Sequence, residues 1–204
     1  MDATTLERYV GKYSLGSTRI LTITRDGTQL NAQITGQPTL PIDEQTPSKF
    51  VWRAVEAHVA FTLGDSGRAA SATIHQGGQD IVAQRLEEAD AQALERQLAD
   101  RIAQQRPQKG SEQALRKALA AADAGAPNYD DMTPSLQAVV RRQLPAIAAT
   151  ATERGAIQSV EFKGVSKSGA DQYVVTYASG KQLQCLIQLN ENDKITTLAL
   201  MPRF

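Results

Sequence analysis

The chain has 204 residues, 22 basic and 22 acidic side chains, and a formal net charge of zero. Apolar residues make up 41% of it, enough for a hydrophobic core, but aromatic residues only 5%, which is few for stacking on bases. The balanced charge argues against a nucleic-acid partner. No segment approaches the ~20 apolar residues of a membrane span. One cysteine and two histidines exclude a disulfide framework and a Cys- or His-rich metal site.

The start of the chain shows no basic segment followed by an apolar one, so a signal peptide is not visible and the compartment stays open. The length fits one large domain or two small ones. Changes in hydrophobic period favour three regions, which are residues 1–87, 88–128 and 129–204.

Residues 1–87 are predicted to form about eight short strands and no helix. Apolar residues alternate with polar ones on both sides of Asp26-Gly27, a dipeptide typical of hairpin turns. The same alternation includes Trp52 and Phe61, and Gly77-Gly78 marks a later turn. Because an open meander leaves exposed strand edges, we expect a closed, lipocalin-like antiparallel β-barrel.

Residues 88–128 change to a helical period and are predicted to be a helical linker. Leu94, Leu98 and Ile102 recur at four-residue spacing, which places them on one helix face. Ser111 is the predicted N-cap of a second helix, because its hydroxyl can accept from a free amide, and Gly125 ends that helix.

Residues 129–204 are predicted to form one helix packed on a curved antiparallel sheet of three or four strands, a cystatin-like layout. Thr133 and Pro134 are typical of a helix start, Pro145 predicts a kink, and Gly155 ends the helix. Alternating apolar residues from Val160 onward predict the strands. The fold class of the whole chain is therefore α+β.

No motif of a self-sufficient enzyme is found. The chain has no G-x-S-x-G or S-x-x-K sequence, and its nearest match to the latter is Thr46-Pro47-Ser48-Lys49. Lys167-Ser168-Gly169 matches one element of the β-lactamase and penicillin-binding-protein site, but without a nucleophile it is interpreted as a turn.

The sequence also gives little support for a metal site or a reactive cysteine. His58 and His75 lie on different predicted strands and could meet across a sheet, although surface or rim positions are favoured. Residues 190–193 offer oxygen atoms but lack a calcium-loop pattern, so they are interpreted as a turn. Cys185 alternates with Leu183 and Ile187, which predicts a buried thiol. No metal site and no cofactor are predicted.

Five residues are candidates for contacting a small ligand, namely Trp52, Phe61, Asp171, Tyr173 and Tyr177. The four aromatic residues are also expected core residues of the two folded regions. Asp171 either stabilises the turn after Gly169 or faces a cavity between the helix and the sheet. No catalytic residue is assigned.

Several short motifs resemble parts of exported bacterial proteins. The N-terminal pieces are Leu6-x-x-Tyr9-x-Gly11-x-Tyr13-x-Leu15, the strands with Phe50 and Phe61, and Ala83-x-Arg85. They resemble a lipocalin-like β-domain found C-terminal to serine hydrolases of the β-lactamase and penicillin-binding-protein type. The later pieces resemble a companion cystatin-like or nuclear-transport-factor-like segment; they are Gly110-Ser111-Glu112-x-Ala114-Leu115-Arg116, Tyr129-x-x-Met132-x-Pro134-x-Leu136, Gly155-Ala156-Ile157-x-Ser159-Val160-x-Phe162 and Gly169-Ala170-Asp171-x-Tyr173.

The resemblance implies an accessory region without catalytic residues of its own, with a hydrolase domain in the same parent chain as its partner. It also implies export to the cell envelope or periplasm. Three hypotheses follow. The first is a non-catalytic accessory or interaction region, and the second is a module that binds a small apolar ligand in the barrel or the helix–sheet cavity. The third is an enzyme that uses Asp171 and Tyr173.

Overall fold

The computed structural model describes residues 1–203. The chain divides into two compact units, a first unit spanning Met1–Ala99 and a second unit that begins at Asp100. Each unit has its own hydrophobic core. The units are therefore described separately, and the sequence-based boundaries at 87 and 128 stay a prediction.

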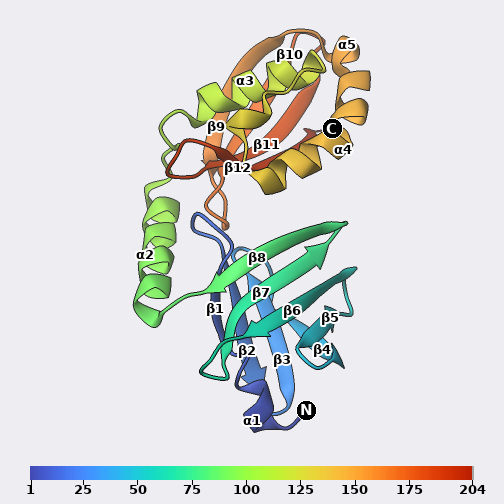
Figure 1. The fold of residues 1–204 in the computed structure, drawn as a ribbon. Coiled ribbons are helices and arrows are strands. Elements are labelled where there is room, and N and C mark those ends of the chain that lie inside the picture. The colour runs from blue at the N-terminus through green and yellow to red at the C-terminus, as the bar shows by residue number, and fades with distance from the viewer. Residues whose placement is uncertain (204) are drawn as a thin grey trace. The chain divides into compact units, whose positions relative to one another are not determined.

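The first unit is a closed antiparallel barrel whose strands follow one another in chain order (Figure 1). The strands are β1 (Gly11–Ser14), β2 (Ile20–Asp26), β3 (Gln29–Ile34), β4 (Leu40–Thr46), β5 (Lys49–Trp52), β6 (Ala57–Leu63), β7 (Ala69–Gln76) and β8 (Gln79–Arg85). Pairing of β1 with β8, which sets Tyr13 opposite Arg85, closes the barrel. The predicted eight-stranded meander barrel is confirmed.

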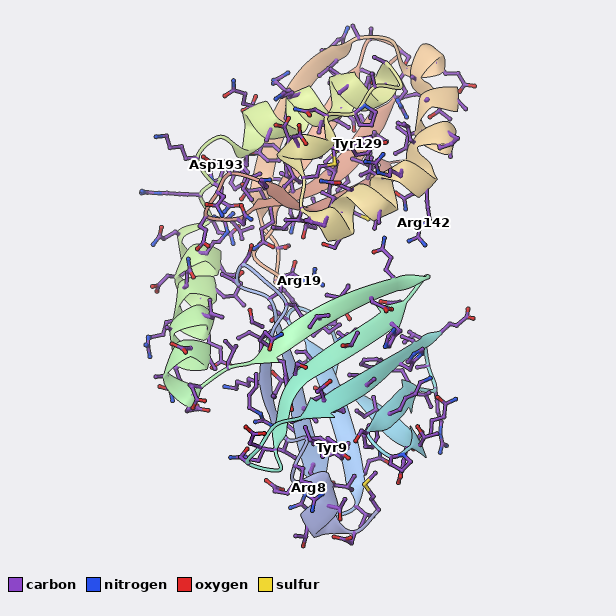
Figure 2. All side chains as sticks on the ribbon, in the orientation of Figure 1. Arg8, Tyr9, Arg19, Tyr129, Arg142 and Asp193 are labelled. Atoms are coloured by element: carbon purple, nitrogen blue, oxygen red, sulfur yellow. The ribbon has the colours of Figure 1, made fainter. Side chains whose placement is uncertain are left out.

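One prediction for this unit was wrong, because a short helix precedes the barrel. Helix α1 (Ala3–Leu6) begins at Asp2, whose carboxylate accepts from the backbone N–H of Thr5 at 2.9 Å. Leu6 and Tyr9 are both buried in the barrel core, and Figure 2 labels Tyr9 beside α1. A single helical turn gives no periodic pattern, so only the Asp cap could have indicated it.

Aromatic side chains fill the barrel interior. Phe61 packs against Tyr9, Tyr13 and Phe50, with ring centroids 4.9, 5.8 and 5.7 Å away. All four side chains are buried. Aromatic pairs at these separations contribute roughly 0.5–1.5 kcal/mol beyond the area they bury, so this cluster organises the barrel core.

Arg85 ties the start of the barrel to its end. Its guanidinium donates to the carbonyl oxygens of Arg8 (3.2 Å), Val10 (3.0 Å) and Ala69, and to the Tyr13 hydroxyl at 2.9 Å. Gly11 lies beneath it with φ of +153°, and a Cβ there would collide with the guanidinium. Glycine therefore serves this position in two ways, by its backbone angle and by its lack of a side chain.

Two helices follow the barrel, α2 (Glu88–Gln104) and α3 (Ser111–Asp123). The predicted N-cap at Ser111 was wrong. The cap position is Gly110 in a left-handed conformation, and Ser111 is the first helical residue. The Ser111 hydroxyl instead lies 2.8 Å from the Tyr173 hydroxyl, in a fully buried pair. A long-range partner thus replaces the local capping bond that the sequence favoured.

The second unit has helices over one face of a four-stranded antiparallel sheet. Its further elements are the 3₁₀ turn η1 (Tyr129–Asp131), α4 (Pro134–Ala149), α5 (Ala151–Arg154), β9 (Ile157–Val165), β10 (Asp171–Tyr177), β11 (Gln182–Leu189) and β12 (Ile195–Arg203), with sheet order β12-β11-β10-β9. Thr133 is the N-cap of α4 and Pro134 follows it, as predicted. The helix continues through Pro145, and Figure 1 shows α4 changing direction along its length. The α+β fold class is confirmed.

Apolar side chains from α3, α4 and the sheet form the second core. Its sheet members alternate along β10 and β11, so they share one face. The core residues are Leu115, Ala118, Leu119, Met132, Leu136, Val140, Tyr173, Val175, Tyr177, Leu183, Cys185, Ile187, Leu189 and Ile195.

Candidate functional site

A concave surface of the first unit lies where β5 turns into β6 and β7 into β8. An outer hollow of about 690 Å³ lies there. Positive φ angles at Gly77 (57°) and Gly78 (72°) make the tight β7–β8 hairpin, which suits the right-handed twist of the two strands. The lining residues are Val51, Trp52, Val55, Glu56, Ala57, His58, His75, Gln76, Gly77, Gly78, Gln79 and Asp80.

A second, inner hollow of about 70 Å³ lies at the adjoining mouth of the barrel. It is mostly apolar, and its lining residues are Ala32, Ile34, Gln37, Pro38, Leu40, Trp52, Val55, Ala57, Ile74 and Gln76. Trp52, Val55, Ala57 and Gln76 border both hollows. We call the surface formed by these four residues and the two hollows the barrel rim.

Exposure at the rim differs between its two large apolar residues. Trp52 is 8% exposed and belongs to the core, whereas Val55 is 41% exposed on the loop between β5 and β6. A drug-sized ligand needs roughly 300–1,000 Å³, so the inner hollow has room only for a group the size of one small side chain. The rim thus combines a fixed aromatic wall with an exposed apolar contact point.

Polar side chains form a row across the outer face of the same strands. His58 is directly opposite His75, and His75 is directly opposite Asp80. The two imidazole rings stack with centroids 4.3 Å apart and an interplanar angle of 23°. The Nδ1–H of His75 donates to the Asp80 carboxylate. Both predicted possibilities for the histidines are therefore realised, a surface position and a meeting across the sheet.

The electrostatic surroundings of His58 disfavour its protonated form. Burial of the ring, together with the positive charge of Lys49 and the adjacent His75, lowers the pKa of His58, and Asp80 opposes this only in part. His58 is therefore neutral at neutral pH, which leaves a ring nitrogen free to accept or to ligate.

The structure places the five candidate ligand residues in different units. Trp52 and Phe61 belong to the barrel core, but only Trp52 borders a hollow there. Asp171, Tyr173 and Tyr177 lie on β10 of the second unit, where Tyr173 and Tyr177 are core residues. The five residues do not form a single site.

Asp171 is fully buried at the start of β10 rather than in a turn. One carboxylate oxygen accepts from the Arg101 guanidinium, and the other accepts from the backbone N–H of Gln108 at 2.8 Å. Arg101 also donates to the carbonyl oxygen of Gly169 at 2.7 Å. The carboxylate thus joins the end of α2 and the segment before α3 to the sheet, and the turn-stabilising interpretation was wrong.

The two tyrosines of β10 differ in their hydroxyl contacts. The Tyr173 hydroxyl pairs with Ser111, whereas the buried Tyr177 hydroxyl has no hydrogen-bond partner among residues 1–203. Burial raises the pKa of Tyr177 to about 12, and the negative charge of Asp123 adds to this effect. Neither hydroxyl is therefore a base near neutral pH.

The remaining motifs lie in loops or in the core. Ser168 lies in the loop between β9 and β10, where its hydroxyl is 2.9 Å from that of Ser166. The Asn190 side chain accepts from the backbone N–H groups of Asn192 and Lys194, as in a simple turn. Cys185 is fully buried, which raises the pKa of its thiol to about 12. Each has the structural role that the sequence predicted.

Sequence reasoning missed two groups of the two units, the contacts of Arg85 and those of Asp171, and it left the meeting of the two histidines as one of two possibilities. Arg85 was noted only as part of a motif, although it bonds four neighbouring groups. The exact pairing of His58 with His75 could not be counted from the turn. Even pairing outward from the Gly64–Gly67 turn sets His58 opposite Thr73, but the register shifts between Thr62 and Leu63. The partners of Asp171 gave no local signal, since Arg101 is 70 residues away in the chain.

Groups of three or more His, Cys, Asp or Glu side chains arranged to hold a metal ion do not occur among residues 1–203. The helices of this part of the chain are too short or too polar to cross a membrane.

Comparison with known proteins gives one partial assignment. No curated protein and no solved structure matches the chain. Residues 1–92, which contain the barrel and the first turn of α2, match a protein family described as a domain of unknown function, DUF3471.

Proposed function

We propose that this chain is a non-catalytic accessory and interaction module that binds a partner protein through the barrel rim. The observation that carries the proposal is the pairing of an exposed apolar residue, Val55, with the small apolar hollow beside Trp52. A hollow of about 70 Å³ accepts one apolar side chain of a partner. Buried anchors of this kind carry most of the binding energy in protein interfaces.

The partner we propose is a serine hydrolase domain of the β-lactamase-related type. The support is the resemblance of the N-terminal motifs, including Ala83-x-Arg85, to β-domains that accompany such hydrolases. The interior of the barrel is filled by its own aromatic residues, so the rim offers the concave surface that a partner can enter.

A binding measurement tests this proposal. The full chain is immobilised, and a purified β-lactamase-related hydrolase domain encoded in the same gene or an adjacent one is passed over it. We expect the wild-type chain to bind and Val55→Asp to bind at least about tenfold more weakly, because a charge would be buried against apolar surface.

The matched control is Val82→Asp, the same change at a residue that is 57% exposed on β8 and does not line either hollow. Equal losses in the two variants would show that the rim is not the interface. A wild-type chain that does not bind the hydrolase domain would refute the proposed partner.

A second candidate is the binding of a small apolar molecule at the outer hollow, whose volume of about 690 Å³ lies in the usual range of ligand sites. Trp52 borders this hollow and is the only tryptophan of the chain, so its fluorescence reports occupancy directly. Titration with the dye ANS or with a medium-chain fatty acid should change the emission of the wild type. Unchanged emission would exclude these ligands from the site.

A further inference from the structure

The only two histidines of the chain lie face to face on neighbouring strands. His58 on β6 and His75 on β7 are direct cross-strand partners, with ring centroids 4.3 Å apart. Both side chains line the open outer hollow of about 690 Å³. Two imidazoles are thus held next to each other on a rigid sheet, with space in front of them for a further group.

Asp80 gives one of these rings a defined orientation. Its carboxylate accepts from Nδ1–H of His75, which leaves Nε2 as the nitrogen with a free lone pair in the neutral ring. Most metal-ligating histidines donate their second ring N–H to a carboxylate, a backbone carbonyl or water, and such a partner fixes the tautomer and makes the ligating nitrogen more basic.

We propose that His58 and His75 together bind one divalent transition-metal ion of the Cu²⁺, Ni²⁺ and Zn²⁺ group, with water in the remaining coordination positions. Imidazole nitrogen suits these ions, whereas Mg²⁺ and Ca²⁺ require oxygen ligands. The general order of affinities makes Cu²⁺ the tightest of the three. Asp80 is a positioning residue that acts through His75.

The two rings are close enough for their nitrogens to reach one ion. Imidazole nitrogens lie roughly 2.0–2.1 Å from such an ion, so two ligating nitrogens on one ion are about 3 Å apart. Because the stacked rings are tilted by only 23°, their in-plane lone pairs do not converge, and binding one ion requires both rings to rotate about their side-chain torsions. Since a third ligand group is absent from residues 1–203, the ion keeps open positions.

The site extends the proposed function and does not depend on it. Metal binding can be measured on the chain alone, without a partner protein. Val55→Asp, which tests the rim interface, leaves both histidines in place, so it should bind the ion like the wild type. Failure of one proposal is therefore distinguishable from failure of the other.

Copper titration of the untagged chain tests the site. Isothermal calorimetry gives stoichiometry and affinity, and the EPR spectrum of bound Cu²⁺ counts its nitrogen ligands. We expect one Cu²⁺ per chain with two imidazole nitrogens, weaker binding of Zn²⁺, and no binding of Mg²⁺. His58→Gln and His75→Gln should each lower the Cu²⁺ affinity more than tenfold. Unchanged Cu²⁺ binding in the double variant would overturn the proposal by showing an adventitious site elsewhere.

The role of Asp80 is tested by Asp80→Asn, with Asp65→Asn in the exposed β6–β7 turn as a matched control for loss of charge. Loss of a carboxylate behind a ligating histidine costs roughly 10–100-fold in metal affinity. Nitrogen-15 NMR of the two imidazoles should show the His75 tautomer disturbed in Asp80→Asn and restored in Asp80→Glu. If Asp80→Asn and Asp65→Asn changed the metal affinity equally and left the His75 tautomer undisturbed, Asp80 would have no positioning role.

Discussion

The two units each use one charged side chain to join distant segments, but the charges have different partners. In the barrel, half-buried Arg85 donates to neutral carbonyl oxygens and the Tyr13 hydroxyl. In the second unit, the fully buried carboxylate of Asp171 needs the Arg101 guanidinium as a counter-charge. Removing Arg85 leaves unpaired carbonyls, whereas removing the Asp171 charge leaves a largely buried, unpaired cation. Removing the Asp171 charge should therefore lower the free energy of unfolding more than removing Arg85 does.

The chain contains a natural reporter for each unit. Trp52, its only tryptophan, is in the barrel core, and Cys185, its only cysteine, is in the second core. Trp52 fluorescence therefore follows unfolding of the barrel, and the reaction of Cys185 with a thiol reagent follows opening of the second unit. The comparison between the units can be tested on the intact chain.

The largest effect is expected from Asp171→Asn. Breaking a buried ion pair by removing one charge costs about 3–5 kcal/mol, so the second unit should open more often. At 1.4 kcal/mol per factor of ten, Cys185 labelling should accelerate at least roughly a hundredfold. The Trp52 unfolding midpoint should shift much less. Stopped-flow labelling and fluorescence-detected denaturation measure the two quantities.

The control for Asp171→Asn is Glu112→Gln, which removes a carboxylate from an exposed pair with Arg116. Exposed pairs contribute about 0–1 kcal/mol, so labelling of Cys185 should hardly change. Equal acceleration in both variants would contradict the special role of the buried carboxylate.

A smaller effect is expected in the barrel from Arg85→Met and from Gly11→Ala. Each should lower the barrel's free energy of unfolding by about 2–4 kcal/mol, because hydrogen bonds to a charged donor are lost or a Cβ displaces the guanidinium. The two changes should be strongly coupled. In the Arg85→Met background, Gly11→Ala should cost only the backbone strain at φ of +153°. Additive losses in the fluorescence-detected cycle would disprove a direct collision.

The sequence predicts the barrel well because its signals are local. Alternation around Asp26-Gly27 and Gly77-Gly78 indicates where strands end, and consecutive strands pair with their neighbours. The β6–β7 hairpin is an exception. Counting outward from the Gly64–Gly67 turn sets His58 opposite Thr73, whereas a register shift between Thr62 and Leu63 accompanies the observed pairing with His75.

In the second unit, local sequence signals predict the strands but not the long-range side-chain contacts. Alternation predicted its strands, but the partner of Asp171 lies on α2, and the hydroxyl partner of Ser111 lies on β10. Both contacts join residues more than 60 positions apart. Local capping rules predicted a different role for Ser111 because its burial depends on tertiary packing.

High pH should weaken the second unit before the barrel. Burial raises the pKa of Tyr13 to about 12 in the barrel, but in the second unit it does so for both Tyr177 and Cys185. The folded chain retains these protons longer than the unfolded one, so stability is present at lower pH and lost as pH rises from about 9 toward 12. Each group contributes a slope of roughly 1 kcal/mol per pH unit.

Denaturant titrations between pH 8 and pH 11 check this prediction. The second unit, followed by far-UV circular dichroism of its helices, should lose stability more steeply than the barrel, followed by Trp52. Equal slopes would contradict the assignment of two such groups to the second unit and one to the barrel.

The smallest expected effect comes from replacing either of two tyrosines, Tyr13 and Tyr177, which are both fully buried. The Tyr13 hydroxyl donates to the carbonyl oxygen of Tyr9 at 2.7 Å and accepts from Arg85, whereas no hydroxyl partner of Tyr177 exists within residues 1–203. Tyr13→Phe should therefore cost about 1–3 kcal/mol, because it leaves a buried carbonyl and a cation without their partner. Tyr177→Phe should change stability by less than about 0.5 kcal/mol or raise it, because it removes a buried hydroxyl that is unpaired. Denaturant titration of the two variants measures both, and a loss at Tyr177 as large as that at Tyr13 would show that a buried water molecule pairs with its hydroxyl.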